Sequence, residues 1–171
     1  MTRARVGMLM GSDSDWPVLE PAARTLAQFG VGCEVRVLSA HRSPAQVRQY
    51  VAGAPKRGVK IFIAAAGGAA HLAGTVAAHT ALPVIGIPVE SKSLRGLDSL
   101  LSTAQMPSGV PVATVAINGG VNAALLAVQI LALSDAALAR RLADYKRSLT
   151  AKTVKADRAL QPKVRAAVKG S

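Results

Sequence analysis

Apolar runs and amphipathic runs alternate regularly along the chain. Five short runs rich in Val, Ile, Leu, Met and Ala have the length of strands, and they cover residues 5–10, 33–38, 60–66, 83–87 and 112–117. Segments with helical periodicity follow them and cover 16–29, 44–54, 71–79, 96–105, 122–133 and a last stretch from Ser134 or Asp135 to about 149. This alternation predicts a single α/β domain, a three-layer α/β/α sandwich with a central parallel sheet.

Composition indicates what fills the core. Half of the 171 residues are apolar, and the aromatic residues are Trp16, Phe29, Tyr50, Phe62 and Tyr145. The interior is therefore predicted to consist mainly of Ala, Val, Leu and Ile, which suits helices packed closely on a parallel sheet. The run 60–66 is almost wholly apolar, as expected for a strand buried on both faces.

Several protein classes are disfavoured by the sequence. No apolar run approaches the ~18 residues of a membrane span, and the chain does not open on a signal-peptide pattern. Cys33 is the single cysteine, which excludes an intramolecular disulfide. We therefore expect a cytoplasmic protein with no membrane partner.

The net charge of +12 is unevenly distributed. From Arg140 onward there are ten basic residues against two aspartates, so this stretch alone carries +8. Nucleic-acid readers usually interleave aromatic and basic residues, whereas this stretch contains only Tyr145. We interpret it as a solvated helix and a frayed tail, expect no nucleic-acid partner, and expect the basic protein to favour small anionic ligands.

Polar residues crowd the loop after the first predicted strand, which reads Gly11-Ser12-Asp13-Ser14-Asp15. Gly11 permits a tight turn. Hydroxyls and free N–H groups at a helix start suit a phosphate, and a carboxylate suits sugar hydroxyls. Capping by Ser14 or Asp15 would account for one polar residue but hardly for four in succession.

The loop after the second predicted strand carries a histidine beside an arginine, in the run Ser39-Ala40-His41-Arg42-Ser43-Pro44. Ser43 and Pro44 have the types preferred at the N-cap and first position of a helix. His41 and Arg42 would then lie at the carboxyl edge of a parallel sheet, where such folds bind ligands. Arg42 could grip a phosphate and His41 could exchange a proton near neutral pH. A surface His beside a surface Arg is the alternative.

Small residues follow the third predicted strand, in the run Ala66-Gly67-Gly68-Ala69-Ala70-His71. Adjacent glycines allow a backbone to approach a ligand closely, although Gly-Gly is also common in ordinary turns. His71 could equally be no more than the first residue of the third helix. A metal site built on His41, His71 and His79 is disfavoured, because no Cys or acidic partner lies at a ligand spacing.

Five motifs in register carry a family resemblance. They are Gly-Ser-Asp-Ser-Asp-Trp, Ser-Ala-His-Arg-Ser-Pro, Ala-Gly-Gly-Ala-Ala-His-Leu, Gly-Leu-Asp-Ser-Leu-Leu-Ser and Gln-Met-Pro-Ser-Gly-Val-Pro-Val. In these motifs the chain closely resembles the 5-(carboxyamino)imidazole ribonucleotide mutases of purine biosynthesis, in their class I stand-alone bacterial form. The likeness extends from about Val6 to Leu149.

The resemblance implies an isomerisation that needs no cofactor or metal. The family moves a carboxylate from the exocyclic nitrogen of an aminoimidazole ribonucleotide to ring carbon 4, by releasing and recapturing carbon dioxide. By motif, His41 is the proton shuttle. The implied substrate-binding residues are Ser12, Asp15 and Arg42, with Gly11, Ser14 and Ser39 in the same pocket, and Ala66, Gly67, Gly68 and His71 around the base and the carbon dioxide. Free carbon dioxide must not escape, so we expect a small, dry pocket.

The resemblance also implies a homo-octamer whose sites lie near subunit boundaries. It assigns residues 1–150 to the catalytic domain and leaves 151–171 as a basic tail, which we expect to be partly disordered. The chain departs from the family pattern at Ala65 and Ala73, and its loop 118–121 is about two residues shorter than the common form.

Three other functions remain open. Direct carboxylation of aminoimidazole ribonucleotide by free carbon dioxide, the class II activity, uses most of the same motifs. A flavodoxin-like electron carrier has the same predicted sheet, but these loops lack the aromatic residues that would flank a flavin. A nucleic-acid-binding module would rest on the basic tail alone.

Overall fold

The computed structural model describes residues 3–169 and divides into two compact units, one up to Ile130 and one from Leu131 onward. The first unit contains a five-stranded sheet in the order β2-β1-β3-β4-β5, with every neighbouring pair parallel. The strands are β1 (Ala4–Met10), β2 (Gly32–Val37), β3 (Ile61–Gly67), β4 (Val84–Val89) and β5 (Ala113–Thr114). The parallel α/β fold predicted from the sequence is confirmed.

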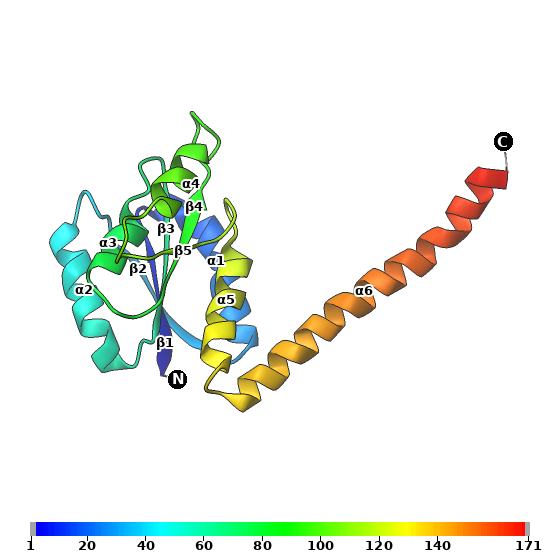
Figure 1. The fold of residues 1–171 in the computed structure, drawn as a ribbon, viewed down its shortest axis with the longest axis horizontal. Coiled ribbons are helices and arrows are strands. Elements are labelled where there is room, and N and C mark those ends of the chain that lie inside the picture. The colour runs from blue at the N-terminus through cyan, green and yellow to red at the C-terminus, as the bar shows by residue number, and fades with distance from the viewer. Residues whose placement is uncertain (1–2, 170–171) are drawn as a thin grey trace. The chain divides into compact units, whose positions relative to one another are not determined.

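Helices connect the strands (Figure 1). They are the short 3₁₀ helix η1 (Asp13–Asp15), α1 (Trp16–Gln28), α2 (Pro44–Arg57), α3 (Leu72–Ala78), α4 (Leu97–Ala104) and α5 (Gly120–Ala132). The start of α5 lies directly against α1. The two backbones are so close there that a side chain at Gly120 would collide with the carbonyl oxygen of Val18. Helices α2 and α3 lie on the other side of the sheet in Figure 1, which gives the three layers.

The apolar face of α2 packs with α3 on one side of the sheet. The cluster joins Val47, Val51 and Ala54 of α2 to Leu72 and Val76 of α3, and all five are at most 2% exposed. Their spacing along α2 is four and three residues, as helical periodicity requires. Because α2 follows β2 and α3 follows β3, this packing holds together the two helices that come after these strands.

The strand order creates a crossover point between β1 and β3. The chain leaves β1 for its neighbour β2 and then returns across β1 to form β3 on the other side. The loops after β1 and β3 consequently diverge, and they leave a crevice at the carboxyl edge of the sheet. This is the edge at which the sequence analysis placed the candidate chemistry.

The fifth strand is shorter than predicted. The sequence pattern indicated residues 112–117, whereas β5 covers only Ala113–Thr114. The backbone continues beside β4 through single hydrogen bonds, from Val115 N to Gly86 O at 3.1 Å and from Asn118 N to Pro88 O at 2.8 Å. Because β5 is an edge strand followed by a tight turn, apolar periodicity overestimates its regular length.

The second unit contains α6 (Ala136–Lys169), which is longer than predicted. Asp135 caps it as expected, since its Oδ1 accepts a hydrogen bond from Leu138 N at 3.0 Å. The helix end predicted near Leu149 is wrong, and residues 150–169, assigned to a partly disordered tail, are helical. Ala, Lys, Arg and Leu favour helix in this stretch, and Pro162 does not end it. Residues 170 and 171 lie outside the described residues.

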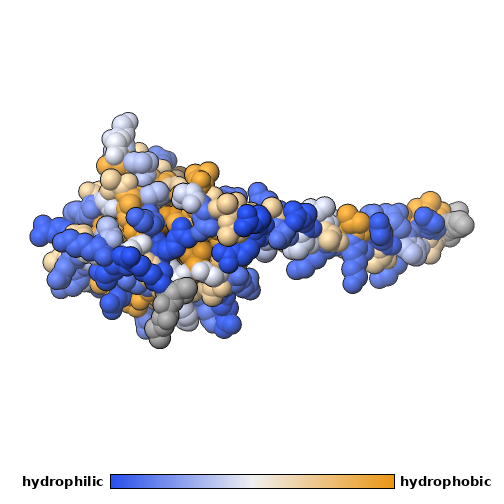
Figure 2. All heavy atoms as spheres, turned by 90° about the horizontal axis from the view of Figure 1, so that it is seen from below, coloured by the Kyte–Doolittle hydropathy of each residue, from blue (hydrophilic) through white to orange (hydrophobic). Residues whose placement is uncertain are grey.

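The far part of α6 is a solvated surface. Every side chain from 146 to 168 is exposed, and Figure 2 shows hydrophilic residues along this helix with isolated apolar ones between them. Within residues 3–169, no helix has both the length and the apolarity needed to cross a bilayer.

Candidate active site

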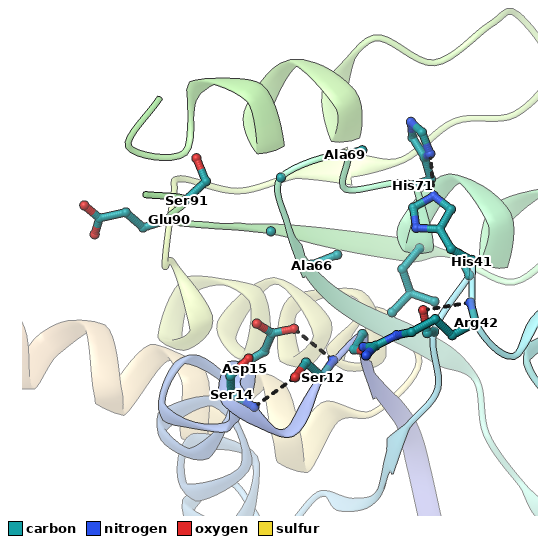
Figure 3. Close-up of a pocket in the computed structure, with 16 residues that line it drawn as sticks. Ser12, Ser14, Asp15, His41, Arg42, Ala66, Ala69, His71, Glu90 and Ser91 are labelled. Atoms are coloured by element: carbon teal, nitrogen blue, oxygen red, sulfur yellow. Dashed lines mark hydrogen bonds between the residues drawn. The ribbon is translucent and has the colours of Figure 1, made fainter. Parts of the chain in front are cut away.

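A cleft of about 450 Å³ opens at the carboxyl ends of β1 to β4. Figure 3 shows the side chains that surround it. All the residues that the sequence analysis named as site residues line this cleft: Gly11, Ser12, Ser14, Asp15, Ser39, His41, Arg42, Ala66, Gly67, Gly68 and His71. Three loops that are distant in the sequence therefore form one concave site.

The first loop is held by a capping box at η1. Ser12 Oγ accepts a hydrogen bond from Ser14 N at 3.3 Å, and Asp15 Oδ2 accepts one from Ser12 N at 3.2 Å. The residue that caps is therefore Ser12, where the sequence analysis considered Ser14 or Asp15. Ser14 and Asp15 both line the cleft wall.

Asp15 is a buried carboxyl group, 8% exposed. Burial raises the pKa of Asp15 above its ordinary value, because the ionised form loses hydration. The backbone N–H groups of Ser12 and Gly11 and the charge of Arg42 oppose this shift without reversing it. A carboxylate kept in such a site is a strong acceptor for ligand hydroxyls.

The second loop is closed by serine hydrogen bonds. Ser39 N donates to Ser43 Oγ at 2.9 Å, Ser43 Oγ donates to Ser39 O at 3.1 Å, and Arg42 N donates to Ser39 Oγ at 3.2 Å. Ser43 stands at the N-cap position as predicted, but its hydroxyl makes no capping bond to the helix. The serines thus fix the backbone on which His41 and Arg42 stand.

Arg42 links the first two loops. Its Nη2 donates a hydrogen bond of 2.7 Å to Gly11 O. Its side chain reaches along the cleft toward Ser12 (Figure 3), and Ser14 lines the same cleft. A cation with several donors in a fixed fork is suited to a phosphate.

His41 contacts His71 at one end of the cleft (Figure 3). The distance between His41 Nε2 and His71 Nδ1 is 2.8 Å, and the rings meet edge to face with centroids 5.0 Å apart. One nitrogen of this pair donates and the other accepts, so His41 keeps Nδ1 for a ligand in this arrangement. His71 occupies the N-cap position of α3 but makes no side-chain cap.

The third loop presents backbone rather than side chains. Gly68 has φ +65°, a left-handed conformation that favours glycine, and a Cβ there would meet no atom within 4 Å. Ala66 and Ala69 add only methyl groups to the wall. This side of the cleft is therefore open, small and weakly polar.

The expectation of a closed, dry pocket is wrong for the single chain. His41 and Arg42 are both exposed, and the cleft opens to solvent on their side. The physical reason is that the loops come from the edge of one sheet, with no second layer of this unit above them. Exclusion of water would require a covering that the described residues of the first unit do not provide.

Five lining residues were missed by the sequence analysis. They are Ala40, Ala69, Leu72, Glu90 and Ser91. Glu90 and Ser91 directly follow β4 and lie on the side of the cleft away from His41 and Arg42 (Figure 3). A polar pair after a buried strand was the available signal. Among the described residues, no group of three or more His, Cys, Asp or Glu side chains could hold a metal ion.

A sequence model of one protein family, described as AIR carboxylase, matches residues 5–152. The matched span includes the whole cleft and most of the chain. The chain belongs to this family.

Named relatives match over most of their length. The N5-carboxyaminoimidazole ribonucleotide mutase of Mycobacterium tuberculosis is 54% identical over 159 residues, covering 93% of this chain and 91% of that protein. The Pyrococcus horikoshii protein of the same name is 53% identical over 147 residues, covering 86% and 83%. The phosphoribosylaminoimidazole carboxylase of Candida albicans is 60% identical over 130 residues, which is 76% of this chain but 23% of that protein.

A solved structure agrees with the architecture. The crystal structure of Treponema denticola PurE superposes with a TM-score of 0.84 at 33% identity, covering 91% of this chain and 97% of that one. This similarity confirms the flavodoxin-like, three-layer fold.

Proposed function

We propose that the protein is an N5-carboxyaminoimidazole ribonucleotide mutase of purine biosynthesis. The observation that carries the proposal is the match to mutases of that name at about 54% identity over nearly the whole of both chains. The product is the 4-carboxylate of the aminoimidazole ribonucleotide. The carboxylate moves from the exocyclic nitrogen to ring carbon 4 through free carbon dioxide.

The phosphate and ribose of the substrate belong at the first two loops. The guanidinium of Arg42 is tied to Gly11 O, and Ser12 and Ser14 line the same cleft, so the three side chains together offer donors for a phosphate. Asp15 accepts ribose hydroxyls, and Ser39 supports the loop on which Arg42 stands. These contacts hold the imidazole ring in one position while its bonds change, which removes most of the entropic barrier to recapture.

His41 carries the proton. Cleavage of the N–C bond releases carbon dioxide and leaves the exocyclic nitrogen to take a proton from the imidazolium. Carbon 4 then attacks the carbon dioxide, and the neutral imidazole removes the proton from that carbon. One proton leaves His41 and one returns, so a single imidazole serves both steps and no redox cofactor or metal is required.

The released carbon dioxide is held beside the third loop until it is recaptured. Ala66, Gly67 and Gly68 offer small apolar groups and backbone there, and His71 closes the end near His41. A neighbouring subunit completes the site, because the cleft of one chain is open where His41 and Arg42 lie. We propose the homo-octamer of the family as the source of that cover, and the cytoplasm as the location.

Direct carboxylation is the second candidate. The Candida carboxylase shares 60% identity with 130 residues of this chain, so the cleft residues alone do not separate the two reactions. The mutase is favoured because the relatives named as mutases match this chain along 83–91% of their own length.

An ultraviolet assay with two substrates tests the proposal. The purified protein should convert N5-carboxyaminoimidazole ribonucleotide without added bicarbonate, and should act far more slowly on aminoimidazole ribonucleotide with bicarbonate. Turnover only in the second assay would establish the carboxylase instead. Turnover in neither would overturn the proposed function.

A further inference from the structure

Asn118 fastens the turn after β5 to the end of β4. Its Oδ1 accepts a hydrogen bond from Glu90 N at 3.0 Å, and its Nδ2 donates to Glu90 Oε2 at 3.3 Å. Its own N–H donates to Pro88 O at 2.8 Å. Three hydrogen bonds from one residue therefore hold the segment 88–90, which ends at the cleft.

Asn118 adopts a backbone conformation that few residue types tolerate. Its φ is +57°, in the left-handed region where Asn is enriched among non-glycine residues. The strain is held by the side-chain contacts to Glu90 on one side and by the following Gly119 and Gly120 on the other. The turn between β5 and α5 is tight, so this conformation brings the amide side chain back onto β4.

The clasp between Asn118 and Glu90 adjoins a second group of hydrogen bonds on the same wall. Ser91 Oγ donates to Asp98 Oδ1 at 2.7 Å and accepts from Leu94 N and Gly96 N. A Cβ at Gly96 would lie 3.3 Å from the Cα of Glu90 and 2.8 Å from Ile117 Cγ2. The segments 90–91, 96 and 117–118 thus meet in close contact, and Asn118 is the side chain that bonds two of them.

We propose that Asn118 is a positioning residue for ligand binding, which acts by holding the Glu90–Ser91 wall of the cleft. Asn118 does not line the cleft itself, whereas Glu90 and Ser91 do. The proposal rests on the proposed function for its substrate. It predicts a loss of substrate affinity when the clasp is broken, with little change in the chemical step at the far side of the cleft.

Asn118→Gly breaks the clasp without straining the backbone, since glycine accepts the same φ. The expected result is a rise in KM of about threefold to tenfold, the value of one or two hydrogen bonds, with kcat within about twofold. Arg95→Gly is the matched control, because Arg95 also has a positive φ, 49°, in the adjoining loop but does not line the cleft. It should leave KM unchanged.

Exchanging the donor and the acceptor between residues 118 and 90 tests whether loss of their contact is what raises KM. Asn118→Asp keeps the acceptor for Glu90 N but sets two carboxylates against each other, so KM should rise at least as much as in Asn118→Gly. Glu90→Gln alone keeps an acceptor for Asn118 Nδ2, and its KM is the reference for the double variant, because Glu90 itself lines the cleft. The double variant, Asn118→Asp with Glu90→Gln, places an amide donor opposite the new carboxylate and should recover most of the lost affinity.

Hydrogen exchange separates this proposal from the proposed function. Faster exchange of the Glu90 amide in Asn118→Gly, measured by mass spectrometry of peptides spanning 88–91, needs no turnover. Unchanged exchange there, an unchanged KM in Asn118→Gly, or no recovery in the double variant would each overturn the inference. An inactive wild type with the faster exchange would refute the mutase activity while leaving the clasp established.

Discussion

The buried charge of Asp15 lowers the stability of the fold, whereas we expect the same carboxylate to strengthen ligand binding. Its carboxylate accepts the Ser12 N–H that starts the first loop, and it faces the cleft that we assign to the ribose. Burial raises its pKa, so the folded protein holds the charged form at a disadvantage relative to the unfolded chain. A residue that destabilises the fold is retained where a ligand needs it.

Asp15→Asn is therefore expected to stabilise the protein at pH 7 and to weaken substrate binding. The raised pKa means that the folded state binds more protons than the unfolded state between the ordinary value of 3.8 and the folded value. Stability falls as pH rises through that window, and the loss is complete above it. The thermal midpoint of Asp15→Asn should exceed that of wild type at pH 7 and approach it near pH 3.8. A midpoint difference that grows on acidification would contradict this sign.

His41→Asn should abolish turnover and leave ribonucleotide affinity within about tenfold, or ~1.4 kcal/mol. Asn fits within the space of the imidazole and stays polar, but it is too short to replace the contact of His41 Nε2 with His71 and cannot exchange a proton near neutral pH. Calorimetric titration with aminoimidazole ribonucleotide measures the affinity, and the ultraviolet assay measures turnover. Retained catalysis in this variant would remove His41 from the mechanism.

The contact between α1 and α5 requires a glycine at position 120. A Cβ at Gly120 would collide with Val18 O and lie 3.7 Å from Ala22 Cβ. Helix α5 begins at this residue, so any added atom displaces the helix start from α1. Backbone carbonyls cannot move aside as flexible side chains do.

Gly120→Ala is consequently expected to destabilise the protein by about 1–3 kcal/mol, the usual effect of overpacking. Gly53→Ala is the matched control. It lies inside α2, where its Cβ would meet only a side-chain atom, Arg57 Nη1 at 3.2 Å, and no backbone, and alanine is favoured over glycine by about 1 kcal/mol in a helix interior. Denaturant midpoints compared at equal protein concentration check both. Equal midpoints for the two variants would show that α5 does not pack on α1 as described.

The sequence predicted best those helices and strands whose ends are determined by residues within the segment itself. β1 to β4 and α1 to α5 begin and end within three residues of the predicted bounds, because apolar periodicity and turn residues act within each segment. β5 and the end of α6 were predicted poorly, since pairing at a sheet edge and the length of an exposed helix leave no apolar pattern. The cleft was predicted from three loops, two of them polar and the third rich in Gly and Ala. Glu90 was missed although it directly follows β4, because the sequence does not show its contact with Asn118, 28 residues away.

The chain extends beyond the part that forms the cleft and matches the family. The family match ends at residue 152, and the exposed half of α6 lies beyond it. The cleft is open beside the exposed residues His41 and Arg42, and we have proposed that a neighbouring subunit covers it. These two features predict that assembly matters for activity and that the end of α6 does not.

Deletion of residues 150–171 should keep kcat/KM within about twofold, because the cleft and the first half of α6 remain; the helix content measured by circular dichroism should fall. Light scattering at micromolar concentration should give the mass of an octamer for the full chain and the shortened chain alike. A monomeric full chain would exclude the shared site, and loss of activity on deletion would give the end of α6 a role in catalysis.

The fate of one carbon atom tests the central claim, that the carboxylate moves within an enclosed site. The substrate is labelled with ¹³C in its carboxylate and converted in buffer containing excess unlabelled bicarbonate, and the product is analysed by mass spectrometry after a single turnover. We expect the label to be retained on carbon 4. A product carrying the unlabelled carboxylate would show that carbon dioxide is drawn from solution, and would contradict transfer within the cleft.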